Sequence, residues 1–224
     1  MKGIYLTGVT VVTAFALPAL VAVLSYLLGC INGAIATSHL FYHDDVRRHG
    51  SGNAGLTNFY RNYGAKCAPM VIAFDMLKAV GAVLLGNYFL GYLGWGAAGK
   101  YFGALFCVIG HMFPVFYGFK GGKGILCSGT LLLLLDWRIA LVGWGAFVVL
   151  WLTTRYVSLG SVAAAVSLPF TTYFVFHNTA CTVLGTCISL LVLWAHRSNI
   201  KRLLSGTESK FHFHVNAPKP GEDE

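Results

Sequence analysis

Seven apolar runs occupy most of the chain, and they constrain its fold more than any other feature. The 224 residues are 56% hydrophobic and only 11% charged, which is more apolar surface than a soluble domain of this size can bury. Inside a bilayer every backbone polar group needs an internal partner, so such runs fold as helices. We therefore expect an all-α polytopic integral membrane protein with about seven transmembrane helices, some shorter than the ~20 residues of a full crossing. The runs are residues 4–31, 67–85, 101–117, 125–135, 139–153, 159–176 and 180–195.

The segments between the runs suggest how the chain is organised. Residues 37–66 are expected to form a long polar loop, and the glycine- and aromatic-rich stretch 86–100 is expected at the membrane interface. Residues 1–210 are interpreted as a single membrane-embedded domain. The stretch 211–224 ends in a proline-containing acidic segment, which is typical of a disordered tail.

The basic residues predict the orientation in the membrane. The formal charge is +8, yet lysines and arginines stand singly at the ends of apolar runs, which argues against nucleic-acid binding. With loops 37–66, 118–124 and 154–158 and the C-terminus on one side, that side holds 12 basic residues and the other holds 3. The positive-inside rule then places the N-terminus outside and the C-terminus and glycine-rich loops in the cytoplasm.

No pattern of cysteines or histidines specifies a metal site. The six cysteines lie almost all in apolar runs without a C-x-x-C pair, as expected for small buried residues. His39, His43 and His49 flank Asp44 and Asp45, but a solvated loop is a better interpretation of this spacing than a metal site. We expect neither a metal nor a cofactor.

The most unusual polar segment is GHMFPVFYGFKGGKG, residues 110–124. Glycine frees the backbone around Gly121 and Gly122 to expose consecutive N–H groups. Such a nest beside Lys120 and Lys123 is typical of an anion site, and a helix beginning after the loop would add its positive end. It is not a Walker A motif, because two residues of that motif are replaced and no strand precedes it. The alternative is a basic turn whose lysines serve only topology.

A second polar segment, GSGNAGLTNFYR at residues 50–61, alternates small residues with amides and ends in an arginine. Backbone donors and the side chains of Ser51, Asn53 and Arg61 suit a phosphate. Most segments rich in Ser, Gly and Asn are only loops, so this alternative stays open.

Two more segments between or after the apolar runs are rich in polar residues. RYVSLGS at 155–161 places hydroxyls near a helix start, where serine capping is the alternative. HRSNIKRLLSGTE at 196–208 places His196 and Asn199 on one helix face, and the alternative is a basic stop signal that binds anionic headgroups. Asp75 and Lys78, three residues apart inside an apolar run, are either a self-neutralising structural pair or a functional pair.

These segments together resemble the bacterial acyl-phosphate:glycerol-3-phosphate acyltransferases. Residues 50–61, 110–124 and 196–208 are similar to that family's three motifs, and Asp75-x-x-Lys78 and residues 155–161 match in order and spacing. The resemblance implies a seven-span enzyme of the bacterial inner (plasma) membrane with its active site on the cytoplasmic side. Such an enzyme moves a fatty acyl group from acyl phosphate to the 1-hydroxyl of glycerol 3-phosphate, giving lysophosphatidic acid and phosphate. The expected partners are glycerol 3-phosphate, long-chain acyl phosphate, the lipid bilayer and, as a candidate, the enzyme that makes acyl phosphate.

The resemblance also suggests roles for individual residues. The lysines and glycine N–H groups of the loop are expected to hold glycerol 3-phosphate, and Arg61, with Ser51 and Asn53, to clamp the acyl phosphate. The proton acceptor is either a substrate phosphate oxygen or His196 oriented by Asn199. Further expected substrate-binding residues are Gly55, Asn58, His111, Ser158 and Ser161, whereas Asp75, Lys78, Arg155 and Glu208 are structural or undecided.

The chain departs from the family pattern just after the glycine loop. Ile125, Leu126 and Cys127 stand where Val, Ala and Thr are usual, which removes a hydroxyl at position 127. We expect this change to affect the shape of the pocket more than the reaction.

Two other classes of function compete with the enzyme. An anion channel or phosphate-ester transporter would also need basic residues, but its site is expected near the midplane, whereas these motifs all fall on one side. A membrane scaffold with headgroup-binding loops explains the charge but not the glycine-rich loop.

The charge asymmetry predicts the topology directly. A reporter fused to the C-terminus should report the cytoplasm and one fused to the N-terminus the outside. Labelling of a Ser51→Cys variant by a membrane-impermeant maleimide should require permeabilised cells. Labelling of that cysteine in intact cells would contradict the predicted orientation.

Overall fold

The computed structural model describes residues 2–211, with side chains from residue 13 onward, and this part of the chain is all-helical. The predicted tail therefore lies outside the described residues except for Phe211. The helices are α1 (Lys2–Cys30), α2 (Gly33–Tyr42), α3 (Leu56–Tyr63), α4 (Ala68–Gly91), α5 (Ala97–Met112), α6 (Ile125–Leu135), α7 (Trp137–Thr154), α8 (Val157–Phe176), α9 (Thr179–Ala195) and α10 (Arg197–Leu204), with the 3-10 turns η1 (Val46–Arg48) and η2 (Val115–Tyr117).

The predicted fold class is confirmed, since every one of the seven apolar runs forms a helix. Within the described residues, five helices are long and apolar enough to cross a membrane: α1, α4, α5 with η2, α7 and α8. The pair α9 and α10, bent by 60° at their junction, gives a sixth span if it is counted as one. With only 11 residues, α6 is shorter than a full crossing, so the number seven stays a prediction.

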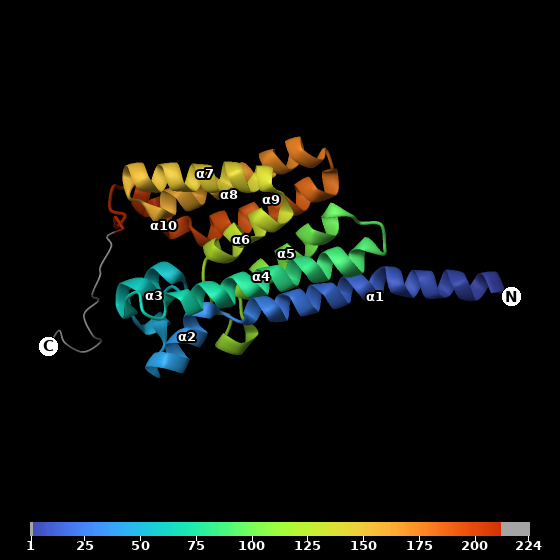
Figure 1. The fold of residues 1–224 in the computed structure, drawn as a ribbon, viewed down its shortest axis with the longest axis horizontal. Helices are drawn as coiled ribbons and strands as arrows, with labels where there is room; N and C mark the ends of the chain where they lie inside the picture. Colours follow the sequence, from blue (N-terminus) through green and yellow to red (C-terminus); the bar gives the residue numbers. More distant parts are fainter. Residues whose placement is uncertain (1, 212–224) are drawn as a thin grey trace.

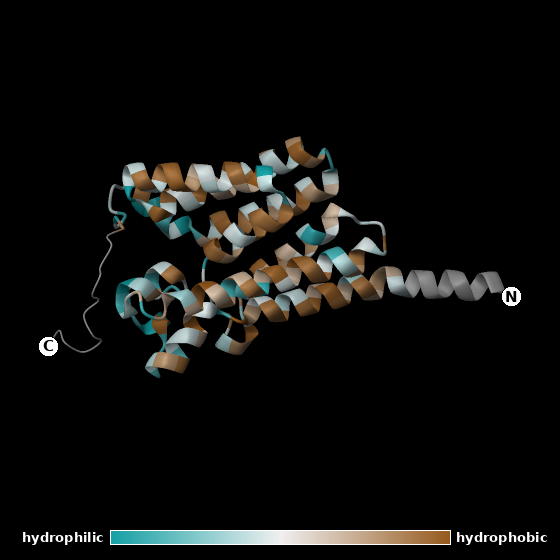
Figure 2. Cartoon of the chain, in the orientation of Figure 1, coloured by the Kyte–Doolittle hydropathy of each residue, from teal (hydrophilic) through white to brown (hydrophobic). Residues whose placement is uncertain are grey.

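The helices form two layers with α6 between them (Figure 1). In one layer α5 packs against α1 and α4, in the other α8 packs against α7 and α9, and the α5–α9 and α4–α6 contacts join the layers. Hydrophobic residues run along the helices, whereas hydrophilic residues concentrate at the helix ends (Figure 2). The short helices α2, α3 and α10 and the start of α6 all lie at the same end of the molecule, opposite the N-terminus of α1.

One expectation about the connecting segments was wrong. Residues 37–66 contain the end of α2, η1 and α3 rather than a continuous loop. The reason is local capping, because the Asn32 side chain accepts from Ile35 N at 3.1 Å and the Asp45 side chain from Arg47 N at 3.0 Å. The stretch 86–100 is largely helical, since α4 continues to Gly91 and α5 begins at Ala97, and its place at the membrane interface stays a prediction.

Glycine allows α4 and α5 to approach each other closely. A Cβ on Gly86 would lie 2.0 Å from Gly99 O, and one on Gly103 would lie 2.2 Å from Ala82 O. The α1–α5 contact is similar, because a Cβ on Gly110 would lie 2.1 Å from Tyr26 O. Small residues at helix crossings are a common way to pack helices in membranes, where dispersion contacts replace the hydrophobic effect. These contacts fix α5, whose C-terminal end leads into the glycine-rich loop.

The α4–α5 contact can be tested with two glycines of the same helix. Gly86→Ala should lower the free energy of unfolding by roughly 1–3 kcal/mol, because the methyl group must displace backbone. Gly91→Ala should be neutral or slightly stabilising, because nothing lies within 4 Å of its Cβ position. Thermal unfolding of both variants in detergent provides the measurement, and equal melting temperatures would contradict the packing described here.

Candidate active site

A cavity of about 500 Å³ opens at the end of the molecule where the polar segments lie. Its polarity changes with depth, because the residues of α6, α8 and α9 that line it become apolar away from this end. The polar part is lined by Ser51, Asn53, Gly55, Asn58, Arg61, His111, Lys123, Ser158, His196, Asn199, Arg202 and Glu208. The deeper part is lined by Leu132, Trp144, Ala165, Leu168, Ile188 and Val192, among others. Such a shape suits a molecule with an anionic head and an apolar tail.

A network of hydrogen bonds joins three separate segments at the polar end. Lys123 of the glycine-rich loop donates to the Asn199 side-chain oxygen. Asn199 Nδ2 donates to Glu208 Oε1 at 2.7 Å, and the Ser158 hydroxyl donates to the same oxygen at 2.7 Å. Arg202 Nε donates to Glu208 Oε2, also at 2.7 Å. Glu208 therefore connects α8 with α10, as a structural carboxylate would.

The polar end holds more positive than negative charge. Burial lowers the pKa of Lys123 to about 8, helped by the charges of Arg202 and Arg61 and opposed by that of Glu208. The Arg61 side chain is exposed at the cavity rim and makes no hydrogen bond or ion pair with any residue that the structure describes. Lys123, Arg61 and Arg202 thus face the polar end with the Glu208 carboxylate, while the Asp75 carboxylate in the cavity wall is paired with Lys78. This excess of positive charge favours an anionic ligand.

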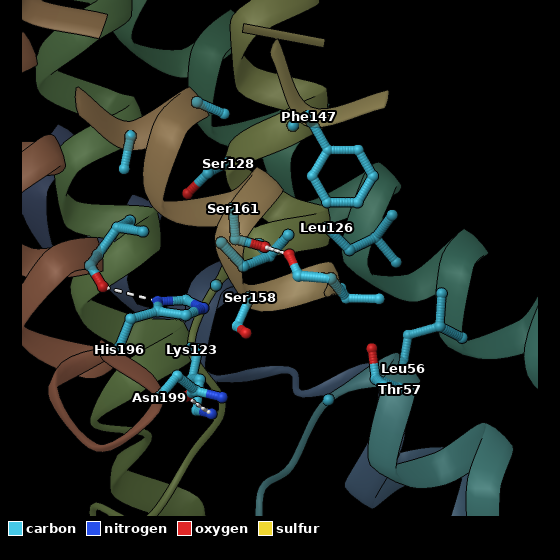
Figure 3. Close-up of a pocket in the computed structure, with 18 of the residues that line it drawn as sticks. Leu56, Thr57, Lys123, Leu126, Ser128, Phe147, Ser158, Ser161, His196 and Asn199 are labelled. Atoms are coloured by element: carbon cyan, nitrogen blue, oxygen red, sulfur yellow. Dashed lines mark hydrogen bonds between the residues drawn. The ribbon is translucent and has the colours of Figure 1, made fainter. Parts of the chain in front are cut away.

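His196 lies at the bend between α9 and α10, with its ring almost fully buried at 3% exposure. Its Nδ1 is 2.8 Å from Val192 O (Figure 3). A carbonyl oxygen only accepts, so Nδ1 carries the proton and Nε2 is left with a free lone pair. The ring is therefore oriented by the backbone of α9, and the predicted orientation of His196 by Asn199 is not what the structure shows.

The glycine-rich loop differs from the predicted nest. Gly121 N donates to Met112 O at 3.1 Å and Gly122 N to His111 O at 3.2 Å, so these two amides complete the end of α5. The prediction that they are free to bind phosphate was wrong. The free amides belong instead to the first turn of α6, residues 125–127, which have no acceptor among the described residues. The predicted positive helix end therefore does border the cavity.

Asn58 lines the cavity, but its side chain supports the loop before α3. Its Nδ2 donates to Val46 O at 3.0 Å and His49 O at 3.1 Å, and its Oδ1 accepts from Ser51 N at 3.0 Å. These bonds fix the backbone that carries Ser51, Asn53 and Gly55, all of which border the cavity. Asn58 is thus better described as a scaffold for the loop than as a ligand-binding residue.

Asp75, Lys78 and His111 form a buried cluster behind the cavity. Lys78 Nζ lies 2.7 Å from Asp75 Oδ1 and 2.6 Å from His111 Nδ1, and it also donates to Ile31 O at 2.9 Å. Asp75 Oδ1 accepts from Gly33 N at 3.1 Å. Asp75 and Lys78 therefore neutralise each other and hydrogen-bond the backbone between α1 and α2. Asp75 and His111 also line the cavity.

Some predicted residues lie elsewhere, and some cavity residues were missed. Lys120 is exposed, and Lys120 and Arg155 are not among the residues that line the cavity. Ser161 lines it, but its hydroxyl donates to Val157 O at 2.8 Å. Arg202 and Ser128 line the cavity but are not among the site residues predicted from the sequence. Arg202 could have been found from its position three residues after Asn199 on α10. Within the described residues there is no group of three His, Cys, Asp or Glu side chains that could hold a metal.

The fold and the site together define a class of protein: an integral membrane protein with a cationic pocket that leads into an apolar cavity. The chain belongs to the glycerol-3-phosphate acyltransferase family, whose model matches residues 19–206. The resemblance noted in the sequence is thereby confirmed.

Individual relatives agree with this assignment. A glycerol-3-phosphate acyltransferase from Thermoanaerobacter sp. (strain X514) is 40% identical over 191 residues, which is 85% of this chain and 94% of the relative. One from Bacillus subtilis (strain 168) is 36% identical over 192 residues, covering 86% and 96%. The crystal structure of PlsY, an integral membrane glycerol 3-phosphate acyltransferase in its glycerol 3-phosphate form, superposes with a TM-score of 0.78 at 32% identity, covering 87% of this chain and 96% of that one. Its lysophosphatidic acid form gives a TM-score of 0.75 at 30% identity, covering 88% and 96%.

Glu208 should contribute to stability through its three donors. Burial alone would raise the pKa of the Glu208 carboxyl, but the bonds from Ser158, Asn199 and Arg202 lower it below its ordinary value of 4.5. Glu208→Ala should cost about 1–3 kcal/mol of unfolding free energy near neutral pH, because buried donors lose their acceptor. A depressed carboxyl pKa stabilises the fold above pH 4.5, so the difference from wild type should shrink as the pH falls below that value.

The measurement for Glu208 is thermal unfolding in detergent at several pH values. Lys201→Ala on the exposed side of α10 is the control and should leave the melting temperature unchanged. A Glu208 variant as stable as this control would contradict the role of the carboxylate.

Proposed function

We propose that this protein transfers a fatty acyl group from acyl phosphate to the 1-hydroxyl of glycerol 3-phosphate, releasing lysophosphatidic acid and phosphate. The observation that carries the proposal is the continuity of a cationic polar end with an apolar cavity. One end offers charge for two phosphates, and the other offers an apolar environment for an acyl chain. The glycerol 3-phosphate and lysophosphatidic acid forms of PlsY support glycerol 3-phosphate as the acceptor here too.

The two phosphates are assigned to different sides of the polar end. Lys123 and the free amides at the start of α6 hold the phosphate of glycerol 3-phosphate, since a helix N-terminus and an ammonium both favour an anion. Arg61, with Ser51 and Asn53, holds the acyl phosphate from the opposite segment. The guanidinium of Arg61 has no competing partner in the described region, so its bidentate fork is free for phosphate oxygens.

The reaction follows from bringing these groups together. The glycerol 3-phosphate 1-oxygen attacks the acyl carbonyl carbon, a tetrahedral intermediate forms, and the bond from this carbon to the phosphate oxygen breaks. Phosphate is a good leaving group, so orientation and electrostatic stabilisation can supply much of the rate. The hydroxyl proton goes either to His196 Nε2, whose lone pair is free, or to a substrate phosphate oxygen.

The proposal includes the place of the protein in the cell. The site end, with its basic residues, lies at the cytoplasmic face of a bacterial inner membrane, where water-soluble glycerol 3-phosphate is supplied. The long acyl phosphate enters from the bilayer or directly from the enzyme that makes it.

An assay with defined donors tests the proposal. Purified protein should convert glycerol 3-phosphate and palmitoyl phosphate to lysophosphatidic acid, which mass spectrometry detects, and should release one phosphate per product. Palmitoyl-CoA should give no product when acyl phosphate is absent. Product formation from palmitoyl-CoA alone would overturn the donor, and no product from any donor would overturn the reaction.

Lys123 should control the affinity for glycerol 3-phosphate. Lys123→Ala should mainly raise the KM for this substrate, by about 1.5–3 kcal/mol in binding free energy, the value of one charge-assisted hydrogen bond. Lys120→Ala is a matched control three residues away, and it should keep the wild-type KM because Lys120 is exposed outside the cavity.

The pH dependence gives a second readout of the same contact. With a pKa of about 8, Lys123 carries its charge below that pH and loses it above, so the KM for glycerol 3-phosphate should rise above about pH 8. Lys123→Arg keeps its charge and should not show this rise. Initial rates from pH 6.5 to 9.5 provide the measurement, and a KM that rises equally in both proteins would contradict the assignment.

A further inference from the structure

One hydroxyl in the cavity wall has no partner. Ser128 Oγ is buried and makes no hydrogen bond within the described residues, although the residue lines the cavity. On the same helix, Thr130 Oγ1 donates to Leu126 O at 3.0 Å, which is the usual fate of a hydroxyl in an apolar helix. Leaving a buried donor unpaired is unfavourable, so a ligand that brings a hydrogen-bond acceptor to this position would gain affinity.

The other buried serines of the cavity are already engaged. The Ser158 hydroxyl donates to Glu208, that of Ser161 to Val157 O at 2.8 Å, and that of Ser189 to Ala165 O at 2.6 Å. Among the buried cavity serines of the described region, Ser128 alone keeps its hydroxyl proton for a ligand.

The place of Ser128 on α6 indicates which part of a ligand it meets. Gly124, Ser128 and Leu132 are spaced four residues apart and all line the cavity, so they follow one face of the helix. At a rise of 1.5 Å per residue, each step is about 6 Å. Gly124 lies beside Lys123 at the polar end and Leu132 lies in the apolar part. Ser128 is therefore at the level where the lining changes from polar to apolar. Its oxygen points to the side of α6 on which Ser161 and His196 lie (Figure 3).

We propose that Ser128 is a further catalytic residue, which donates a hydrogen bond to the carbonyl oxygen of the acyl group. This inference rests on the proposed function. A ligand with its phosphate at the polar end and its acyl chain beyond Leu132 has its carbonyl between them, at the level of Ser128. As the glycerol 3-phosphate oxygen attacks, the carbonyl oxygen becomes an oxyanion and the hydrogen bond to it strengthens.

The hydroxyl acts as a donor and stays unmodified through the reaction. No base within the described residues bonds to Ser128 Oγ, so nothing activates it as a nucleophile. The neighbouring Cys127 cannot take this role, because its sulfur faces Cys107 Sγ at 3.7 Å in the buried core.

The test compares two hydroxyl deletions on α6. Ser128→Ala should lower kcat/KM for palmitoyl phosphate about tenfold to a hundredfold, the effect of removing one donor to a developing oxyanion, and leave the KM for glycerol 3-phosphate unchanged. Thr130→Val removes a hydroxyl that faces away from the cavity and should keep the wild-type kcat/KM. Ser128→Thr restores a hydroxyl and should recover part of the rate.

Melting temperatures separate this role from a structural one. Ser128→Ala should melt at the wild-type temperature or above it, because it removes an unpaired buried group from the free protein. A variant that loses stability and activity in parallel would show that the hydroxyl has a structural partner and would overturn the inference. A kcat/KM equal to that of Thr130→Val would overturn it as well.

The design also distinguishes failure of the inference from failure of the proposed function. If wild-type protein uses acyl-CoA and not palmitoyl phosphate, the donor assignment fails, and the same comparison with acyl-CoA judges Ser128, because both donors carry the carbonyl. If wild-type protein fails to acylate glycerol 3-phosphate with either donor, the proposed function fails and the inference fails with it.

Discussion

The buried ion pair between Asp75 and Lys78 is the interaction on which the arrangement of the site depends. The helix is interrupted between α1 and α2, and in a bilayer the backbone groups at such an interruption need protein partners. Lys78 and Asp75 supply them for Ile31 O and Gly33 N. Both charges are almost fully buried, so loss of either would leave the other uncompensated, which costs far more than the intact pair gains.

The segment between α1 and α2 helps to position the loops that line the cavity. Asn32, which follows the break, donates to Ala54 O at 3.1 Å and so places the segment before α3. The same Ala54 oxygen would lie 2.3 Å from a Cβ on Gly122, so only glycine allows the two loops to touch. Contact between the loops places Lys123 and the start of α6 opposite Arg61. Gly122 therefore serves close packing of the two loops, and the proposed anion site is formed by Lys123 and the first turn of α6.

Sequence reasoning predicted the helices and the residues of the site better than it predicted their individual roles. The apolar runs required helices, and the polar segments did meet at one end, because each lay at the end of a run. Lys120 and Lys123 looked alike in sequence, and only packing of the loop decides that Lys123 is half-buried at the cavity while Lys120 is exposed. Asn58 looked like a ligand-binding residue in the sequence. Its hydrogen bonds to Val46 O and His49 O depend on the folded loop, which the sequence pattern does not reveal. Ser128 was missed because a serine in an apolar run normally bonds to its own helix.

The electrostatics of the polar end are consistent with the two anionic substrates of the proposed reaction. Lys123, Arg61 and Arg202 line the cavity, Arg202 is paired with Glu208, and the Asp75 carboxylate is paired with Lys78. Burial is the main reason that the pKa of Lys123 is lowered, and the charges of Arg202 and Arg61 add to it. A phosphate bound beside Lys123 would favour the protonated form of this lysine. In the proposed reaction a second phosphate binds Arg61 at the cavity rim, and the cations screen the repulsion between the two substrates. Bringing two anions together is an electrostatic obstacle to that reaction, and the excess of cations at the polar end lowers it before the chemical step begins.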